Sequence, residues 1–254
     1  MTTQSRRDTI VEMVRLGEVS VAELARTFEV TESTVRRDLA RLAGEQRIVR
    51  TFSGATGRPE AEAEAPTSVR AQTARQAKHR IATHARTMIP PSAWVYLDAG
   101  TTCAGLAQRL VDAEDVTVVT PSLLVVRALA KAPRVTVLAT GGRLRPISEA
   151  FVGREAERLL QHVSIDTAFF SADAVHPARG ILEVDTDQIA LKEAVVRAAR
   201  RVVVLADASK IIDHVPAGYW LPWPRECEIV VDAAAAQHQL DALRATGPTV
   251  TLLT

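Results

Sequence analysis

From about residue 70 onward, short apolar runs alternate with segments of helical periodicity, and this alternation constrains the fold more than any other feature of the chain. The apolar runs are continuous and rich in β-branched residues, as strands covered on both faces should be. They lie at 94–97, 116–119, 135–139, 167–171, 202–206 and 229–231, with a further candidate at 249–253. Helical patterns fall between them, at about 74–89, 102–111, 122–131, 153–161, 187–200 and 234–245. This order predicts a mostly parallel, doubly wound α/β sheet.

The first 55 residues lack this alternation and carry short helical patterns instead. The spacing of their apolar residues predicts a first helix over about 5–16. Ser20 and Glu23 form a capping-box pattern, which satisfies free backbone amides at the start of a second helix. Thr31 is a favourable N-cap for a third helix that runs to about Ala43. Because only a short turn separates the second and third helices, we expect a helix-turn-helix unit.

The predicted third helix has one apolar face and one polar face. Val35, Leu39 and Leu42 fall at i, i+4 and i+7, and therefore share the buried face. The residues that point away from that face or flank it are Ser33, Thr34, Arg36, Arg37, Ala40 and Arg41. Such a face suits the major groove of DNA, since Arg bonds guanine bidentately and Ser or Thr bonds bases or phosphates. The alternative is a set of ordinary solvated arginines, because residues 31–51 carry a net charge of only +2.

A β-hairpin wing is expected after the third helix. Residues Gln46–Phe52 are strand-like and lead into Ser53-Gly54-Ala55. Within them, Arg47 and Arg50 are exposed candidates for contact with the DNA backbone or minor groove.

A linker is expected between the two regions. Residues 56–69 hold two prolines and an acidic Ala/Glu stretch without a sustained apolar period. We therefore expect a winged helix-turn-helix domain over 3–58, a linker over 59–73 and a larger Rossmann-like α/β domain over 74–254.

Composition limits the classes of function that remain. Thirty-one basic residues against thirty acidic ones leave a net charge of +1, so any DNA contact must come from a local cluster of charge. No apolar run reaches the roughly 18 residues that a membrane span needs. The two cysteines cannot form a disulfide framework, and neither Cys nor His has the spacing of a structural zinc site. We expect a cytoplasmic protein without a metal or another cofactor.

Loops that follow predicted strands carry groups that favour anions, and such loops are where parallel sheets bind ligands. Gly100, Thr101 and Thr102 combine a close backbone approach with hydroxyl groups and a helix N-terminus. The loop Gly141-Gly142-Arg143 adds a guanidinium group. In the loop 206–210, Lys210 adds an ammonium group and Asp207 an acceptor for sugar hydroxyls. Together these loops indicate a small phosphorylated ligand.

Each of these residues also has an interpretation without a ligand. The threonines cap a helix start equally well, and Arg143 is equally explained as a solvated loop residue. Lys192 lies within a helical pattern, from which long side chains commonly extend their charge to solvent. Cys103 is expected to be a small buried residue at a helix start.

Residues 6–55 resemble the winged helix-turn-helix of DeoR-family bacterial repressors, and VSVAELARTFEVTESTVRRDL within them is close to that family's signature. The resemblance implies that Ser33, Thr34, Arg36 and Arg37 read DNA. The family usually ends its wing in Arg-Thr-x-Gly-Gly-Ala, and Ser53 stands here in place of the first Gly. That departure concerns the wing tip rather than the reader helix.

The resemblance continues to about residue 232. DAGTT at 98–102, TPS at 120–122, GGRLR at 141–145, AFVG at 150–153 and ADASK at 206–210 resemble the DeoR-family sensor domain. That domain is similar in fold to ribose 5-phosphate isomerase, and in the family it binds a phosphorylated sugar or a related metabolite. The effector contacts that the resemblance implies are Asp98, Gly100, Thr101, Thr102, Gly141, Gly142, Arg143, Lys192, Asp207 and Lys210. Residues 211–224 depart from the family, which usually follows the Lys with Phe-Gly.

The principal hypothesis is a transcriptional regulator, a repressor of a sugar or carbohydrate operon that is controlled by a phosphorylated sugar and is not an enzyme. We expect a homodimer or tetramer on double-stranded operator DNA, since two reader helices ~34 Å apart match a repeated half-site. One alternative is a sugar-phosphate isomerase-like enzyme in which Asp98 or Asp207 is the base. The other is an interaction domain with an empty pocket.

Overall fold

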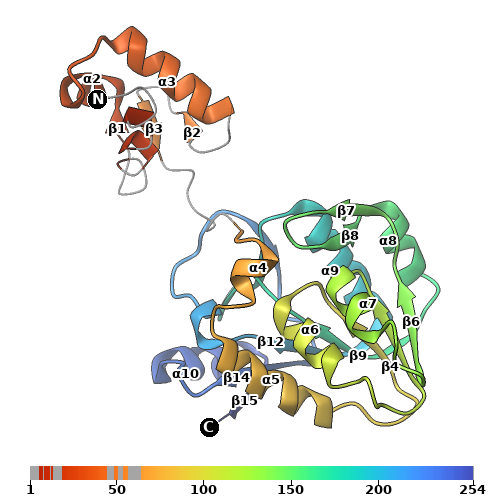
Figure 1. The fold of residues 1–254 in the computed structure, drawn as a ribbon. Helices are drawn as coiled ribbons and strands as arrows, with labels where there is room; N and C mark the ends of the chain where they lie inside the picture. The colour runs from red at the N-terminus through yellow and green to blue at the C-terminus, as the bar shows by residue number, and fades with distance from the viewer. Residues whose placement is uncertain are drawn as a thin grey trace. The chain divides into compact units, whose positions relative to one another are not determined.

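The chain divides into two compact units, Met1–Ala63 and Glu64–Thr254 (Figure 1). The computed structural model describes residues 6–7, 9–11, 13, 19–44, 49–50, 54–56 and 64–253. Each unit is built around a hydrophobic core of its own.

The smaller unit contains the expected helix-turn-helix and wing. The described residues 6–7, 9–11 and 13 of the predicted first helix are helical. Two further helices follow, α2 (Val21–Thr27) and α3 (Glu32–Gly44). The strands β1 (Val19–Ser20), β2 (Val49–Arg50) and β3 (Gly54–Thr56) pair antiparallel in the order β1-β3-β2. The predicted wing hairpin is therefore formed by β2 and β3.

Local signals in the sequence explain where these helices begin. The Ser20 hydroxyl accepts a hydrogen bond from the Glu23 amide at 3.1 Å, as the capping pattern predicts. Ile10, Leu24 and Val35 have no exposed surface and form the centre of the small core. Burying side chains of this size contributes roughly 1.5–3 kcal/mol each to the stability of the folded unit. This burial stabilises helices that are short by themselves.

The larger unit is organised around a seven-stranded sheet in which all neighbouring strands are parallel. Its order is β15-β14-β12-β9-β4-β5-β6. The strands are β4 (Trp94–Leu97), β5 (Val116–Thr120), β6 (Val135–Ala139), β9 (Ile165–Phe170), β12 (Ala199–Leu205), β14 (Cys227–Asp232) and β15 (Thr249–Leu253). This sheet confirms the doubly wound α/β architecture, and each of the apolar runs identified above forms one of its strands.

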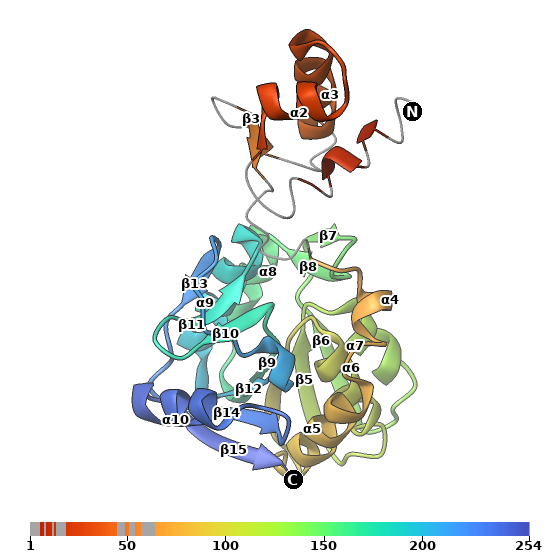
Figure 2. The ribbon, with the colours of Figure 1, turned by 90° about the vertical axis from the view of Figure 1, so that its left-hand side faces the viewer.

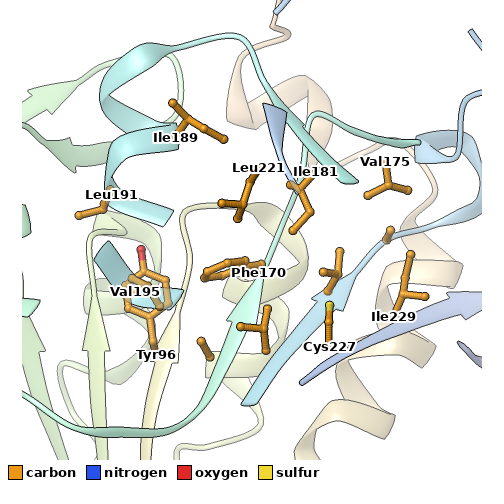
Figure 3. Close-up of a cluster of buried hydrophobic side chains, with 14 of the residues drawn as sticks. Tyr96, Phe170, Val175, Ile181, Ile189, Leu191, Val195, Leu221, Cys227 and Ile229 are labelled. Carbon is orange, nitrogen blue, oxygen red and sulfur yellow. The ribbon is translucent and has the colours of Figure 1, made fainter. Parts of the chain in front are cut away.

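Helices cover both faces of this sheet (Figure 2). On one face lie α5 (Arg75–Thr87), α6 (Thr101–Gln108) and α7 (Leu123–Leu129), and on the other lie α8 (Arg154–Leu160), α9 (Thr186–Ala198) and α10 (Gln237–Thr246). Each face has its own apolar cluster. Figure 3 shows the cluster under α9, where Leu191 and Val195 lie near Tyr96 and Phe170.

Several short elements of the larger unit were not predicted. They are the hairpin of β7 (Arg143–Arg145) and β8 (Ala150–Val152), the antiparallel sheet of β10 (Ala174–His176), β11 (Gly180–Glu183) and β13 (Tyr219–Leu221), the helix α4 (Thr67–Arg70) and a 3-10 turn over Ala208–Lys210. With three or four residues each, these elements are too short to produce a readable period in the sequence.

The boundary of the larger unit also differs from the expected linker. The range 59–73 was expected to connect two domains, yet the larger unit begins at Glu64 and includes α4. The physical reason is burial, since Glu64 and Thr67 are 8% and 6% exposed. None of the helices over the described ranges has the length and apolar character that a membrane crossing requires.

Candidate functional site

Helix α3 presents the polar face that its sequence predicts. Val35 and Leu39 are buried at 0% and 1% exposure, whereas Ser33 and Arg37 on the opposite side are exposed. Arg36 and Arg41 are also exposed, and Thr34 is half-buried. Of the two wing candidates, Arg50 lies in β2, and Arg47 lies outside the described residues.

A buried carboxylate fixes the inner side of α3. Asp38 is 2% exposed, and its two oxygens accept hydrogen bonds from the Nε atoms of Arg6 and Arg7 at 2.8 and 2.7 Å. Both guanidinium groups lie within ion-pair distance of Asp38, which anchors the predicted first helix to α3. Sequence reasoning treated Asp38 only as one acidic residue among the arginines. The available signal of its burial was its position directly after Arg37, on the same side of the helix as Val35 and Leu39.

The arginines of the exposed face are not equivalent. Arg36 pairs with Glu32 one turn earlier at 2.7 Å, and both side chains are about half exposed, so the pair is weak and can exchange for another anion. Arg37 forms no ion pair with any other residue that the structure describes. Unlike Arg36, Arg37 therefore has an exposed guanidinium group that is not paired with a described carboxylate.

In the larger unit, the loops identified from the sequence follow strands of one parallel sheet. Asp98 follows β4, Gly141 follows the end of β6, and Asp207 follows the end of β12. Because these strands are parallel, their carboxyl ends lie at a single edge of the sheet. The structure thus gathers the predicted ligand residues along that edge.

A buried ionic cluster lies at the centre of this edge. The Lys192 ammonium pairs with Asp98, lies 3.1 Å from a Glu183 oxygen and donates to the Ser171 carbonyl at 2.9 Å. Asp98 also accepts hydrogen bonds from the Ser171 amide and hydroxyl, both at 3.1 Å. Lys192 is only 2% exposed. Its side chain therefore does not extend to solvent, and it positions Asp98.

Burial and charge act against each other in this cluster. Burial alone would lower the pKa of Lys192, but the Asp98 and Glu183 carboxylates outweigh it and hold that pKa above its ordinary value. Burial raises the pKa of Glu183, and the nearby Asp173 and Asp98 charges add to this, although Lys192 opposes it. One ammonium group thus lies against two buried carboxyl groups. Sequence reasoning missed Glu183 because it lies in the unpredicted strand β11.

Two glycines at this edge have no room for a side chain. A β-carbon on Gly100 would lie 2.5 Å from the Ser171 hydroxyl oxygen. Gly142 has a φ of +106°, and a β-carbon there would lie 2.6 Å from the Val152 carbonyl oxygen. Gly100 opens α6, where Thr102 is buried and Thr101 is half-buried. Close packing by itself therefore explains Gly100 and Gly142 without a ligand.

Two ammonium groups at the same edge donate hydrogen bonds to backbone carbonyls. Lys210 donates to the Asp173 carbonyl at 3.1 Å, and Lys78 of α5 donates to the Arg70 carbonyl at 2.6 Å. Both side chains are half-buried, and neither forms an ion pair with another described residue. Burial lowers the pKa of Lys78, and the nearby Lys210 and Arg70 charges lower it further, against an opposing effect of Asp207. Bound anions stabilise such an arrangement.

Sequence reasoning missed Lys78. The signal it carried was its position beside the buried residues Ala77 and Ile81 of α5, where a solvated lysine is unexpected. The remaining predicted contacts are engaged within the chain. Arg143 is exposed and pairs with Asp187 at 2.6 Å. Asp207 accepts hydrogen bonds from the Ser209 amide and hydroxyl at 3.2 and 2.5 Å.

The surroundings of Cys103 do not favour a reactive thiol. Cys103 is completely buried, as expected from the sequence, and burial raises the pKa of its thiol. Over the ranges that the structure describes, no group of three or more His, Cys, Asp or Glu side chains could hold a metal ion.

Two family profiles together match most of the chain. The profile described as the DeoR-like helix-turn-helix domain matches residues 6–58, and that of the DeoR C terminal sensor domain matches residues 73–219. The first covers α2, α3 and the wing strands. The second covers the ionic cluster and the loops at the carboxyl edge of the sheet.

Curated relatives match over most of their length. An uncharacterized HTH-type transcriptional regulator of Escherichia coli, YgbI, is 35% identical over 207 residues, which are 81% of this chain and 80% of that protein. A putative aga operon transcriptional repressor of Escherichia coli is 32% identical over 99% of this chain and 94% of its own. The glycerol-3-phosphate regulon repressor of Escherichia coli is 28% identical over 83% of each chain.

A weaker likeness links the fold to solved structures. A D-ribose-5-phosphate isomerase in complex with phospho-erythronic acid has a TM-score of 0.42 and 18% identity, covering 56% of each chain. A likeness of this degree assigns no chemistry to the present site.

Proposed function

The chain belongs to the DeoR family of transcriptional regulators, and on that premise we propose that a phosphorylated sugar controls its binding to an operator. The observation that carries the proposal is that one chain combines two features. Helix α3 has an exposed polar face on which Arg37 is unpaired among the described residues, and the larger unit has a parallel sheet whose carboxyl ends carry the loops of the ligand site. Repressors of the aga operon and of the glycerol-3-phosphate regulon are among its relatives. Their names support repression of a carbohydrate operon as the direction of control.

The proposed reader is α3 together with the wing. Ser33, Thr34, Arg36 and Arg37 face the major groove, with Arg41 at the end of the same face and Arg47 and Arg50 at the wing. The buried Asp38 supports this assignment, because it holds the inner side of α3 through Arg6 and Arg7.

The proposed ligand site has two ends. Lys78 and Lys210 supply charge for the phosphate group, and Thr101 and Thr102 at the start of α6 supply hydroxyls. Asp98, positioned by Lys192 and Ser171, and the backbone at Gly100, Gly141 and Gly142 contact the sugar. Arg143 can leave its exposed partner Asp187 to bind the same ligand.

Binding without turnover is favoured by the hydrogen bonds of the two candidate bases. Asp98 already accepts from Lys192 and Ser171, and Asp207 already accepts from Ser209. Both carboxylates thus already serve as hydrogen-bond acceptors within the fold. We therefore infer a cytoplasmic regulator that is not an enzyme, and incubation with pentose and hexose phosphates is expected to give no isomerised product.

Replacement of Arg37 tests the DNA-binding part. Arg37→Ala is expected to weaken binding to a DNA fragment from upstream of the protein's own operon by roughly 5- to 150-fold, as loss of one base contact does. Fluorescence anisotropy measures the Kd, and Arg134→Ala is the matched control, since Arg134 is an exposed arginine of the larger unit. Equal affinity of Arg37→Ala and the wild type would contradict the assigned reader face.

A ligand screen tests the sensor part. Ribose 5-phosphate, glucose 6-phosphate and glycerol 3-phosphate are compared by thermal shift with the same compounds lacking phosphate. A ligand at about 100 times its Kd adds roughly 2.7 kcal/mol to the stability of the folded chain. A phosphorylated member that stabilises the protein is also expected to change its affinity for operator DNA.

A further inference from the structure

The first residues of the larger unit are bound to the β7–β8 hairpin. Glu64 lies within ion-pair distance of Arg145 in β7, and its side chain is only 2% exposed. Three residues later, the Thr67 amide donates to the Ile147 carbonyl at 3.2 Å, and the Thr67 hydroxyl donates to Glu149. The start of the sensor unit is thus attached to the hairpin at two successive points.

The hairpin in turn leads to the ligand site. Arg143, an expected ligand contact, and Arg145 are alternate residues of the same strand and therefore lie on one face of it. Arg145 also donates to Gln188 at 3.2 Å, and Gln188 donates to Glu183 at 2.8 Å. Glu183 contacts Lys192, which holds Asp98. A continuous chain of polar contacts therefore joins Glu64 to the centre of the site.

The same segment reaches the other end of the site through Arg70. The Arg70 guanidinium lies 3.0 Å from Glu64 and 3.9 Å from Asp173. The Arg70 carbonyl accepts the hydrogen bond of Lys78, and the Asp173 carbonyl accepts that of Lys210. A phosphate that draws Lys78 and Lys210 toward itself competes with both of these bonds.

We propose that Glu64, Arg70 and Arg145 form a coupling clamp, that is, a set of ion pairs that links ligand binding to DNA binding. The clamp holds Glu64, the first residue of the larger unit, differently when the ligand site is empty and when it is occupied. The proposal rests on the proposed function, since it requires both operator DNA and a phosphorylated sugar. The Glu64 carboxylate lies between two guanidinium groups, so a shift of either arginine leaves Glu64 paired with the other. Two alternative pairings of one buried charge are the kind of bistable element that a ligand can bias.

The clamp acts on the connection to the DNA-binding unit. Glu64 is the first residue of the larger unit, so the clamp holds the end of that unit from which the chain continues toward α3. Neither ligand needs to contact the clamp itself. The clamp contributes to the coupling between sugar-phosphate binding and operator binding rather than to the affinity of either.

The substitution Glu64→Gln tests this inference because it keeps the shape of the side chain and removes its charge. The sugar phosphate used is the one of ribose 5-phosphate, glucose 6-phosphate and glycerol 3-phosphate that most stabilises the wild type. The Kd for operator DNA is measured by fluorescence anisotropy in the presence and in the absence of this compound. The affinity of the same compound is measured by calorimetry. In Glu64→Gln both separate affinities are expected to stay within about threefold of the wild type, while the effect of the sugar phosphate on operator Kd falls at least about fivefold.

Matched variants separate coupling from stability. Glu114→Gln removes a carboxylate from an exposed pair with Arg134 and is expected to respond like the wild type. Arg145→Lys keeps the charge but loses the forked contact with Gln188 and Asp185, and is expected to lose coupling as Glu64→Gln does. If Glu64→Gln does not fold, Arg145→Lys supplies the same measurement.

The outcomes distinguish the two proposals. A wild type that responds to the sugar phosphate, with Glu64→Gln and Arg145→Lys responding equally, overturns the clamp and leaves the proposed function intact. A wild type whose operator Kd is unchanged by every sugar phosphate overturns the proposed function, and the clamp with it.

Discussion

The partners of individual lysines determine which charges at the carboxyl edge of the sheet are available to a ligand. Lys192 is surrounded by Asp98 and Glu183 and has almost no exposed surface, so it is committed to the fold and positions its neighbours. Lys78 and Lys210 have only backbone carbonyl partners among the described residues, so their charge is available to a ligand. The distinction between a positioning lysine and a binding lysine rests on these partners.

Affinity for phosphate is expected to depend on the protonation of Lys78. Because burial lowers the pKa of Lys78 from 10.5, the ammonium loses its proton at a lower pH than a solvated lysine does. Anion binding favours the charged form, so affinity for a sugar phosphate is fully present below that pKa and falls as the pH rises through it. Calorimetry with the most stabilising sugar phosphate is expected to show weaker binding at about pH 9.5 than at about pH 7.

Arginine at the same position supplies the contrast. Lys78→Arg remains charged throughout this range, so its affinity is expected to change little between the two pH values. Lys131→Arg, at an exposed lysine, is the control and is expected to keep the pH dependence of the wild type. An identical decline in Lys78→Arg and in the wild type would assign the effect to another group.

At the scale of elements, the length of an apolar run determines whether the sequence alone predicts a strand. Continuous runs of four or more residues that are apolar or β-branched, such as 116–119, form strands, and the sequence shows them without knowledge of their neighbours in space. Elements such as β7 and β11 have no such signal, because their residues are fixed by contacts distant in the chain, including Arg145 with Glu64 and Glu183 with Lys192. The sequence therefore predicts the sheet and its loops, whereas the ionic partners within the site require the structure.

Helix α3 is expected to depend on its buried carboxylate. Asp38→Asn leaves Arg6 and Arg7 beside a neutral group, and removal of one partner from a buried ion pair costs about 3 kcal/mol or more. The side chains of Arg6 and Arg7 are 12% and 14% exposed and can reach water, so we expect the lower end of that range. The smaller unit of Asp38→Asn should therefore unfold at a lower urea concentration than that of the wild type.

The position of the tryptophans allows the two units to be observed separately. Trp94, Trp220 and Trp223, which are all the tryptophans of the chain, lie in the larger unit. In Asp38→Asn, far-ultraviolet circular dichroism is expected to show an early partial transition that tryptophan fluorescence does not follow. Glu32→Gln is the matched control, since its exposed pair with Arg36 contributes at most about 0.5 kcal/mol. Coincident transitions in Asp38→Asn and the wild type would contradict the role of Asp38.

At the scale of the whole molecule, net charge and the size of the reader favour binding of more than one copy to DNA. A net charge of +1 gives the chain little nonspecific attraction to phosphate, and a single α3 contacts only a few base pairs. Two copies with reader helices about 34 Å apart place both in successive major grooves on one side of the duplex, which corresponds to half-sites about 10 base pairs apart. The proposed homodimer or tetramer therefore predicts a repeated operator whose spacing matters.

Synthetic operators test this expectation directly. Adding about 5 base pairs between the half-sites turns the second to the opposite side of the duplex, and affinity is expected to fall at least about tenfold, toward that of a single half-site. Adding about 10 base pairs returns both half-sites to one side and should restore part of the loss, since the two copies must then span a longer distance. Anisotropy titrations give the Kd values, and light scattering of the complexes gives the number of protein copies bound. Equal affinity at every spacing, with one copy bound, would show that a single α3 and its wing suffice, and would contradict the proposed oligomer.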